Sequence, residues 1–198
     1  MTPSNALSRA LHAPADPPLQ PLPHPVVELL ESLDAPPRLA AHLRAVHDVA
    51  VQLVEWLEHQ HPEIAVDRAA VLFGAATHDI GKTVHTAELS EPGSLHEEAG
   101  RELLLAHGFE PGLARFAGTH GSWSAPGTTL EDLVVSTADK VWKNKRVPEL
   151  EDLLISRLAQ ATGAEPWEAY LALDDLLARI GGGADGRLAH QASFPVHG

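Results

Sequence analysis

The segment from Pro36 to Gln60 has the apolar spacing of one long amphipathic helix, and this spacing restricts the folds open to the chain. Pro36 and Pro37 suit the first turn of such a helix, and Pro62 lies beyond its end. Its apolar residues recur every three or four positions, at Leu39, Leu43, Val46, Val49, Ala50, Leu53 and Leu57. We therefore expect a long helix over this segment.

The rest of the chain from Pro25 onward also has the pattern of helices rather than strands. Asp67 can cap one of these helices, and Ser94 with Glu97 has capping-box spacing before another. No stretch alternates with period two for long enough to indicate a strand. Further helical segments are expected near residues 24–34, 68–79, 95–108, 111–120, 129–145, 147–163 and 165–181. The sequence therefore predicts an all-α fold.

The two ends of the chain lack the helical pattern of its middle. Residues 1–24 are too proline-rich for a packed element and predict a flexible lead. Residues 183–198, which begin within the glycine-rich stretch GGGADG, show no clear pattern and are expected to form a C-terminal tail. The helical domain is accordingly predicted over residues 25–182.

Composition excludes several classes of protein and of site. The 198 residues suit one domain, and the absence of cysteine excludes disulfides, thiolate zinc sites and cysteine nucleophiles. A formal charge of −13 argues against a broad nucleic-acid surface. No apolar run approaches the roughly 20 residues that span a bilayer, and no signal-peptide pattern opens the chain. We expect a cytoplasmic protein with no membrane partner; the sequence indicates no oligomeric state.

The stretch GAATHDIGKTVH, residues 74–85, places His78, Asp79, Gly81 and Lys82 together at the end of an apolar run. One interpretation is an ordinary helix C-terminus, where histidine favours the negative end of the dipole and glycine supplies a left-handed cap. The other is a pair of adjacent metal ligands held by the end of a helix. The choice depends on the other polar residues of the chain.

Four more histidines and one aspartate border the apolar faces of the expected helices. On the long helix His42 borders the apolar stripe, and His47 lies off its opposite border. His96 opens one helix and His120 ends another. Asp139 follows the apolar stretch LVVSTA, and a buried carboxylate requires a cation, a hydrogen-bond network or a metal. Each residue alone has a structural explanation, but together they form a ligand set suited to Fe, Mn, Zn or Mg.

The sequence THDIGK resembles the signature of the HD-domain superfamily in its HDIG form. The resemblance runs from about Pro36 to Arg146 and includes APPRLAAHLRAVHDVA, LHEEAGRELLLAHG, ARFAGTH and VVSTADK. It implies a single HD-domain helical bundle and a metal-dependent phosphohydrolase. By this resemblance the core ligands are His42, His78, Asp79 and Asp139, while His96 and His120 match the extra histidines of members that hold two metals.

The resemblance leaves two candidates for the first histidine ligand. The family pattern has small apolar residues four and eight positions after this histidine. His42 is followed by Val46 and Ala50 at these positions, whereas the residue eight positions after His47 is Glu55. The register therefore favours His42.

The resemblance also suggests how the residues would act. If two divalent transition-metal ions bind, Asp79 can offer one carboxylate oxygen to each, and a bridging water would lose a proton to give a hydroxide that attacks phosphorus. Lys82 is expected to neutralise a phosphoryl oxygen or the leaving group. The basic cluster ADKVWKNKR supplies Lys143 and Arg146 for a more distant phosphate, unless it is simply a solvated helix end.

The predicted function is hydrolysis of a phosphate ester of a nucleotide or similar small molecule. The alternative is a two-iron oxygenase, because some HD-fold relatives activate dioxygen with the same kind of ligands. A third possibility is a degenerate domain used for binding, which the presence of every expected ligand disfavours. Lys82 and the basic cluster favour hydrolysis over oxygenation.

Overall fold

The computed structural model describes residues 5–196, and all regular secondary structure in this range is helical. The all-α prediction is confirmed. No helix of the described chain is long and apolar enough to cross a membrane. The elements are α1 (Asn5–His12), α2 (His24–Ser32), α3 (Pro37–Gln60), α4 (Arg68–Thr77), the 3₁₀ helices η1 (Ile80–Thr83) and η2 (Thr86–Leu89), α5 (Leu95–Ala106), α6 (Pro111–Thr119), α7 (Leu130–Val141), α8 (Pro148–Thr162), α9 (Pro166–Gly181) and α10 (Ala184–Ala192).

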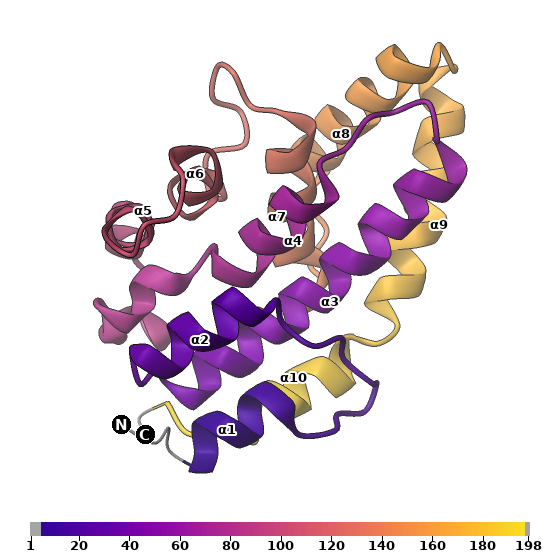
Figure 1. Cartoon of the computed structure of the whole chain (residues 1–198). Helices are drawn as coiled ribbons and strands as arrows, with labels where there is room; N and C mark the ends of the chain where they lie inside the picture. Colours follow the sequence, from indigo (N-terminus) through magenta and orange to yellow (C-terminus); the bar gives the residue numbers. More distant parts are fainter. Residues whose placement is uncertain (1–4, 197–198) are drawn as a thin grey trace.

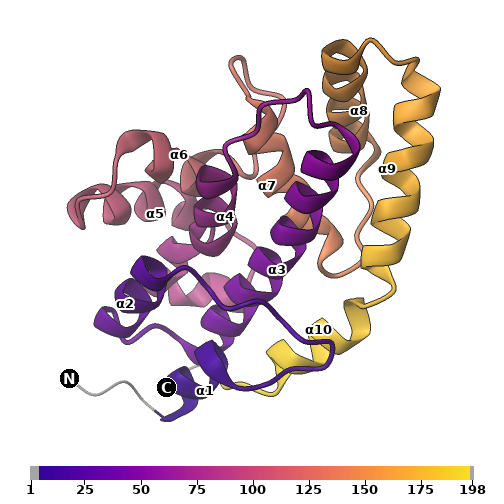
Figure 2. The same ribbon diagram turned by 45° about the vertical axis from the view of Figure 1, so that its right-hand side comes forward.

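Helix α3 is the long helix that the apolar spacing predicts, and it is the central element of the fold. It runs the length of the molecule, with α1 and α10 against its N-terminal end and α4 and α7 along its side (Figures 1 and 2). Helices α8 and α9 lie at the far end, and α5 and α6 form a separate layer beside α4. This arrangement places the N-terminal part of α3, around His42, next to the C-terminal ends of α4 and α7.

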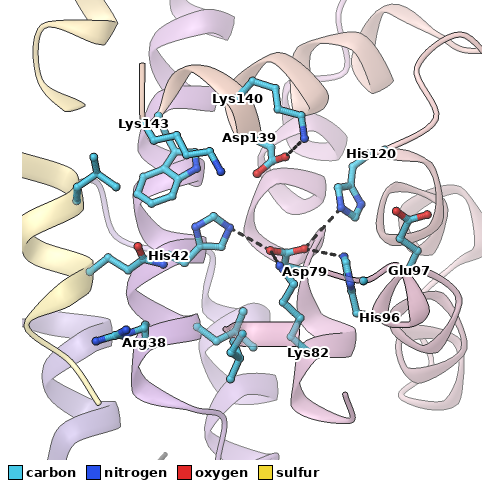
Figure 3. Close-up of a pocket in the computed structure, with 17 residues that line it drawn as sticks. Arg38, His42, Asp79, Lys82, His96, Glu97, His120, Asp139, Lys140 and Lys143 are labelled. Atoms are coloured by element: carbon cyan, nitrogen blue, oxygen red, sulfur yellow. Dashed lines mark hydrogen bonds and ion pairs between the residues drawn. The ribbon is translucent and has the colours of Figure 1, made fainter. Parts of the chain in front are cut away.

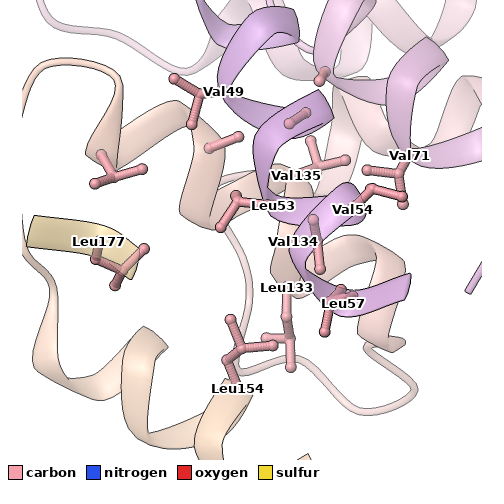
Figure 4. Close-up of a cluster of buried hydrophobic side chains, with 14 of the residues drawn as sticks. Val49, Leu53, Val54, Leu57, Val71, Leu133, Val134, Val135, Leu154 and Leu177 are labelled. Atoms are coloured by element: carbon pink, nitrogen blue, oxygen red, sulfur yellow. The ribbon is translucent and has the colours of Figure 1, made fainter. Parts of the chain in front are cut away.

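Two groups of buried apolar side chains divide α3 along its length. Residues before Arg44 pack with α1, α2 and α4, and residues after it pack with α7, α8 and α9. Figure 4 shows the second group, in which Leu53 and Leu57 of α3 lie among Leu133 of α7 and Leu154 of α8. The boundary between the two groups falls close to His42, so the fold brings polar side chains together between two apolar cores.

The capping predictions are half correct. Asp67 caps α4, with its Oδ1 accepting from Ala70 N at 3.0 Å. The prediction of a capping box at Ser94 is wrong, because the Ser94 side chain makes no cap bond. The backbone N–H groups that open α5 donate instead to Glu88, six residues before Ser94. Local spacing cannot reveal an acceptor that reaches the helix end from a preceding turn.

Residues 5–24 are not the flexible lead that the proline content predicts; residues 1–4 lie outside the described residues. Leu7 and Leu11 of α1 are buried, as are Leu19 and Leu22 beyond it. Arg44 of α3 donates to the carbonyl oxygens of residues 13, 19 and 20, at 2.7, 3.1 and 3.4 Å. The lead is therefore held by a side chain of another helix, which its own composition does not reveal.

Residues 184–192 form helix α10 within the segment predicted to be a tail. Arg187 is buried and donates to Trp142 O at 2.8 Å and to Ile180 O at 2.6 Å. These bonds satisfy carbonyl groups at the ends of α7 and α9, where helices leave unpaired acceptors. They fix α10 beside the end of α7; residues 197 and 198 lie outside the described range.

We predict that Arg44→Met lowers the free energy of unfolding by about 3 kcal/mol, because three carbonyl groups lose a charged donor. Urea titration followed by circular dichroism measures this change. Arg179→Met is the matched control, because Arg179 is exposed on α9 and should change stability by less than about 0.5 kcal/mol. Equal stability of the two variants would show that Arg44 does not fasten the lead.

Candidate metal centre

Five helices each contribute to one cluster of buried polar side chains. His42 comes from the second turn of α3, and Asp139 comes from the last turn of α7. The other members lie at helix ends: His78 and Asp79 after α4, His96 at the start of α5 and His120 after α6. All six are at least nine-tenths buried, and Figure 3 shows His42, His96 and His120 around the carboxylate of Asp79. The structure therefore brings together every residue predicted as a ligand.

The end of α4 explains how two adjacent residues, His78 and Asp79, can both point into the site. His78 is the C-cap residue, and its Nδ1 donates to Ala75 O at 3.0 Å. The chain then turns at Asp79 into the 3₁₀ helix η1, so the two neighbouring side chains both point into the site. The stretch is therefore a helix terminus, and this terminus presents the two side chains that are the candidate ligands.

Gly81 has a different role from the left-handed cap considered for it. Its φ is not positive, and it lies within η1. A Cβ at this position would overlap the backbone of His96 and Gly100 on α5. Because Gly81 has no side chain, η1 and α5 approach closely, and this approach brings His96 to within 3.0 Å of Asp79.

The six side chains form two groups around the two oxygens of Asp79. Oδ2 lies 3.1 Å from His42 Nε2 and 3.5 Å from His78 Nε2, which is itself 3.4 Å from Asp139 Oδ1. Oδ1 lies 3.0 Å from His96 Nε2 and 3.5 Å from His120 Nε2. Ligand atoms within each group lie close enough to hold one cation: His42, His78 and Asp139 in the first, and Asp79, His96 and His120 in the second.

Hydrogen bonds outside the cluster determine which histidine nitrogens face its centre. His78 Nδ1 and His120 Nδ1 each lie 3.0 Å from the carbonyl oxygen three residues earlier, so each Nδ1 carries the proton. His96 Nδ1 is held in the same way by Glu88 Oε2 at 2.5 Å. In the neutral ring each Nε2 is then an acceptor that faces a carboxylate. Converging buried acceptors fit a cation better than they fit one another.

The charge states of the cluster are set by its two buried carboxylates. Burial would raise the pKa of Asp79, but His78, His42 and His96 hold it well below its ordinary value. The pKa of Asp139 also stays low despite burial, because of His78 and Lys140. Burial lowers the pKa of His120 to about 4. At neutral pH the carboxylates are therefore ionised and His120 is neutral. Burial would lower the pKa of His78 and of His96, but Asp79, together with Asp139 at His78 and Glu88 at His96, raises it. An ion that binds these two nitrogens therefore displaces protons.

His47, the second candidate for the first histidine ligand, lies outside the cluster. It is buried elsewhere on α3, and burial together with Arg44 and Arg68 lowers its pKa to about 4. Neither group of candidate ligands includes it. The structure thus agrees with the register that favours His42.

The cluster opens into a cavity of about 490 Å³ lined by four cations. Lys82 Nζ lies 2.6 Å from Asp79 Oδ2, and Lys140 Nζ lies 2.5 Å from Asp139 Oδ2. Arg38 lines the wall next to α10, and Lys143 extends into the cavity near His42 (Figure 3). Positive side chains thus surround the candidate ligands in a protein whose formal charge is −13.

Arg146 differs from its predicted place at a substrate phosphate. It does not line the cavity, and its guanidinium donates to both oxygens of Glu151 and to Asp174 Oδ1, at 2.7 to 2.9 Å. The last turn of α7 points Lys140 toward the cavity, whereas Arg146 follows that helix and is neutralised by α8 and α9. Their closeness in the sequence does not reveal that Lys140 lines the cavity while Arg146 pairs with carboxylates outside it.

Several cavity residues are not found by reasoning from the sequence. Lys140 stands in the basic cluster without an assigned role, and Arg38 is not singled out. Glu88, which contacts His96 from outside the cavity lining, is not singled out either. Leu188 and Gln191 line the cavity from α10, within the segment expected to be a patternless tail. For Lys140 the available signal is its position next to a predicted ligand; for α10 the local sequence contains no comparable signal.

A comparison with family models matches residues 39–142 to the HD domain. The chain belongs to the HD-domain family. This membership implies metal-dependent hydrolase-type chemistry, and the match includes all six candidate ligands. Comparisons with curated proteins and with solved structures found no match. Helices α8, α9 and α10 follow the matched HD domain, and α10 completes the wall of its cavity.

We predict that His42→Ala lowers the number of bound divalent ions from about two per chain to about one, whereas His47→Ala leaves it unchanged. His42 Nε2 faces Asp79, and His47 faces neither group of candidate ligands. Elemental analysis of protein dialysed against Mn²⁺ and then against buffer measures the difference. A loss of metal in His47→Ala with full content in His42→Ala would reverse the assignment.

Proposed function

We propose that this HD-domain protein hydrolyses a phosphate ester of a nucleotide or similar small molecule. The observation that carries the proposal is the single cavity in which two His/Asp groups lie beside four cationic side chains. Its volume of about 490 Å³ falls within the range of small-molecule sites, roughly 300 to 1,000 Å³. A small anion is the kind of substrate that such a lining favours.

The proposed centre holds two divalent ions, one in each group. His42, His78 and Asp139 would hold the first and His96 and His120 the second, with Asp79 offering one oxygen to each. Bound ions of this kind supply Lewis acidity toward a phosphoryl oxygen and an activated water as nucleophile. The convergence of buried acceptors on the carboxylate supports this assignment.

The lysines of the cavity provide the remaining charge stabilisation. Lys82 and Lys140 lie beside the carboxylates of the two groups, from where their ammonium groups can meet the oxygens of a phosphoryl group. Lys143 follows the end of α7 and lies near His42, where it can bind a more distant anionic part of the same substrate (Figure 3). In this proposal Lys82 and Lys140 stabilise the phosphoryl group that reacts, and Lys143 orients the rest of the substrate.

Metal analysis followed by a substrate screen tests the proposal. The protein is loaded with Mn²⁺ and assayed for phosphate release from a panel of nucleoside monophosphates, diphosphates and sugar phosphates. Release that disappears in Asp79→Ala supports hydrolysis. Absence of release from the whole panel, together with a mixed-valence iron signal and oxygen consumption in the iron-loaded protein, would favour the oxygenase instead.

We predict that Lys82→Ala keeps the metal content near that of the wild type but lowers kcat for phosphate release by about 10²-fold. Removing a cation beside Asp79 does not weaken the binding of another cation, whereas a transition-state contact is lost. Lys82→Arg should recover little, because a planar guanidinium does not replace a compact ammonium in this place. Steady-state kinetics on metal-loaded variants measures both effects.

Lys145→Ala is the matched control for Lys82→Ala. Lys145 is exposed and does not line the cavity, so this substitution removes the same charge and should leave kcat unchanged. Wild-type kcat in Lys82→Ala would reduce Lys82 to a charge that balances Asp79. It would also remove one reason for preferring hydrolysis.

A further inference from the structure

Glu88 lies in η2, outside both groups of candidate ligands, and makes three hydrogen bonds at the start of α5. Its Oε1 accepts from Leu95 N at 3.0 Å, and its Oε2 accepts from His96 N at 3.1 Å. Oε2 also lies 2.5 Å from His96 Nδ1. Gly93 lies against this carboxylate, at a position where a Cβ would overlap it. One side chain therefore caps the helix and holds the ring of its second residue.

The position of His96 on its helix explains why a carboxylate is needed there. His78 and His120 follow the ends of α4 and α6, so each Nδ1 finds a backbone carbonyl three residues earlier. His96 opens α5, and the first turn of a helix presents unpaired N–H groups rather than carbonyl groups. A histidine there has no acceptor from its own helix, and Glu88 supplies one from outside.

We propose that Glu88 is the positioning residue of the second ion site. By accepting from His96 Nδ1, it holds the proton on that nitrogen and leaves the lone pair of Nε2 facing Asp79 Oδ1, 3.0 Å away. His96 Nε2 is buried and its close polar neighbour is this carboxylate oxygen, so an ion between the two atoms would have both as ligands. The inference rests on the proposed metal centre, and it assigns the residue that completes one of its two halves.

The two groups should therefore respond differently to a change at Glu88. An acceptor behind a ligating histidine fixes its ring and raises its basicity, and losing such a partner lowers metal affinity by about 10- to 100-fold. The hydrogen bonds of the Glu88 side chain go to Leu95 and His96, and His42, His78 and Asp139 belong to the other group, so the first site should keep its affinity.

Titration of the full-length protein with Mn²⁺, followed by the electron paramagnetic resonance signal of free Mn²⁺, tests the assignment. Glu88→Gln keeps an oxygen that can cap α5, but it removes the charge and can present an amide N–H to His96. It should bind one ion with wild-type affinity and the other about 10-fold more weakly or worse. Glu91→Gln is the matched control, because Glu91 is exposed in the same loop; both ions should bind as in the wild type.

A double-mutant cycle with His96→Ala separates positioning from a general effect on the fold. If Glu88 acts through His96, then His96→Ala and the double variant His96→Ala/Glu88→Gln should bind one ion with the same Kd. Wild-type binding of both ions by Glu88→Gln would overturn the proposal. Equal weakening of both sites, or a further loss in the double variant, would also overturn it.

The readout is metal affinity, so it is independent of the reaction that the centre performs. Wild-type protein that binds two Mn²⁺ ions but releases no phosphate would contradict the proposed hydrolysis and leave the role of Glu88 testable in the same titration. Wild-type protein that binds fewer than two ions would contradict the second site itself, and with it this inference.

Discussion

The buried carboxylate of Asp79 is the group on which the arrangement of the site depends. Each of its oxygens faces the Nε2 atoms of two histidines, and Lys82 adds a further cationic contact. A charge removed from water to this extent is costly unless it is compensated at close range. The surrounding groups supply that compensation, since the pKa of Asp79 stays low despite burial. Positive charge at this point, whether on an ion or on a side chain, stabilises the packing of the five helices that meet there.

Two features of the backbone bring the histidines together around Asp79. The chain presents His78 and His120 at helix C-termini, where each ring is fixed by a carbonyl of its own last turn. His96 is delivered from the opposite kind of terminus, through the close approach of η1 to α5 at Gly81. The site thus combines residues whose orientation is set locally with one whose orientation is set by Glu88, from another element. The second group of candidate ligands, which contains His96, therefore depends on the position of η2, whereas the first group does not.

Helices outside the matched HD domain complete the cavity and hold its walls. Arg187 ties α10 to the carbonyl ends of α7 and α9, and Gln191 of α10 then lines the cavity. The segment after α10 is also held at the N-terminal end of α3, where Arg38 Nε donates to Phe194 O at 3.0 Å. All six candidate ligands lie in the matched span, whereas part of the cavity wall comes from α10.

The sequence by itself determined the helical class and the long helix from Pro36 to Gln60, and its resemblance to the HD-domain signature selected the six candidate ligands. Apolar periodicity and the order of residues in a motif are properties of the sequence alone. Tertiary structure decided what lies next to what. Arg44 holds the proline-rich lead, Glu151 and Asp174 neutralise Arg146, and Glu88 replaces the expected cap at Ser94. In each case the partner comes from another element or a preceding turn, and the pairing depends on how the backbone places the two groups in space. The pattern of one segment does not contain the distance between that segment and its partner in space.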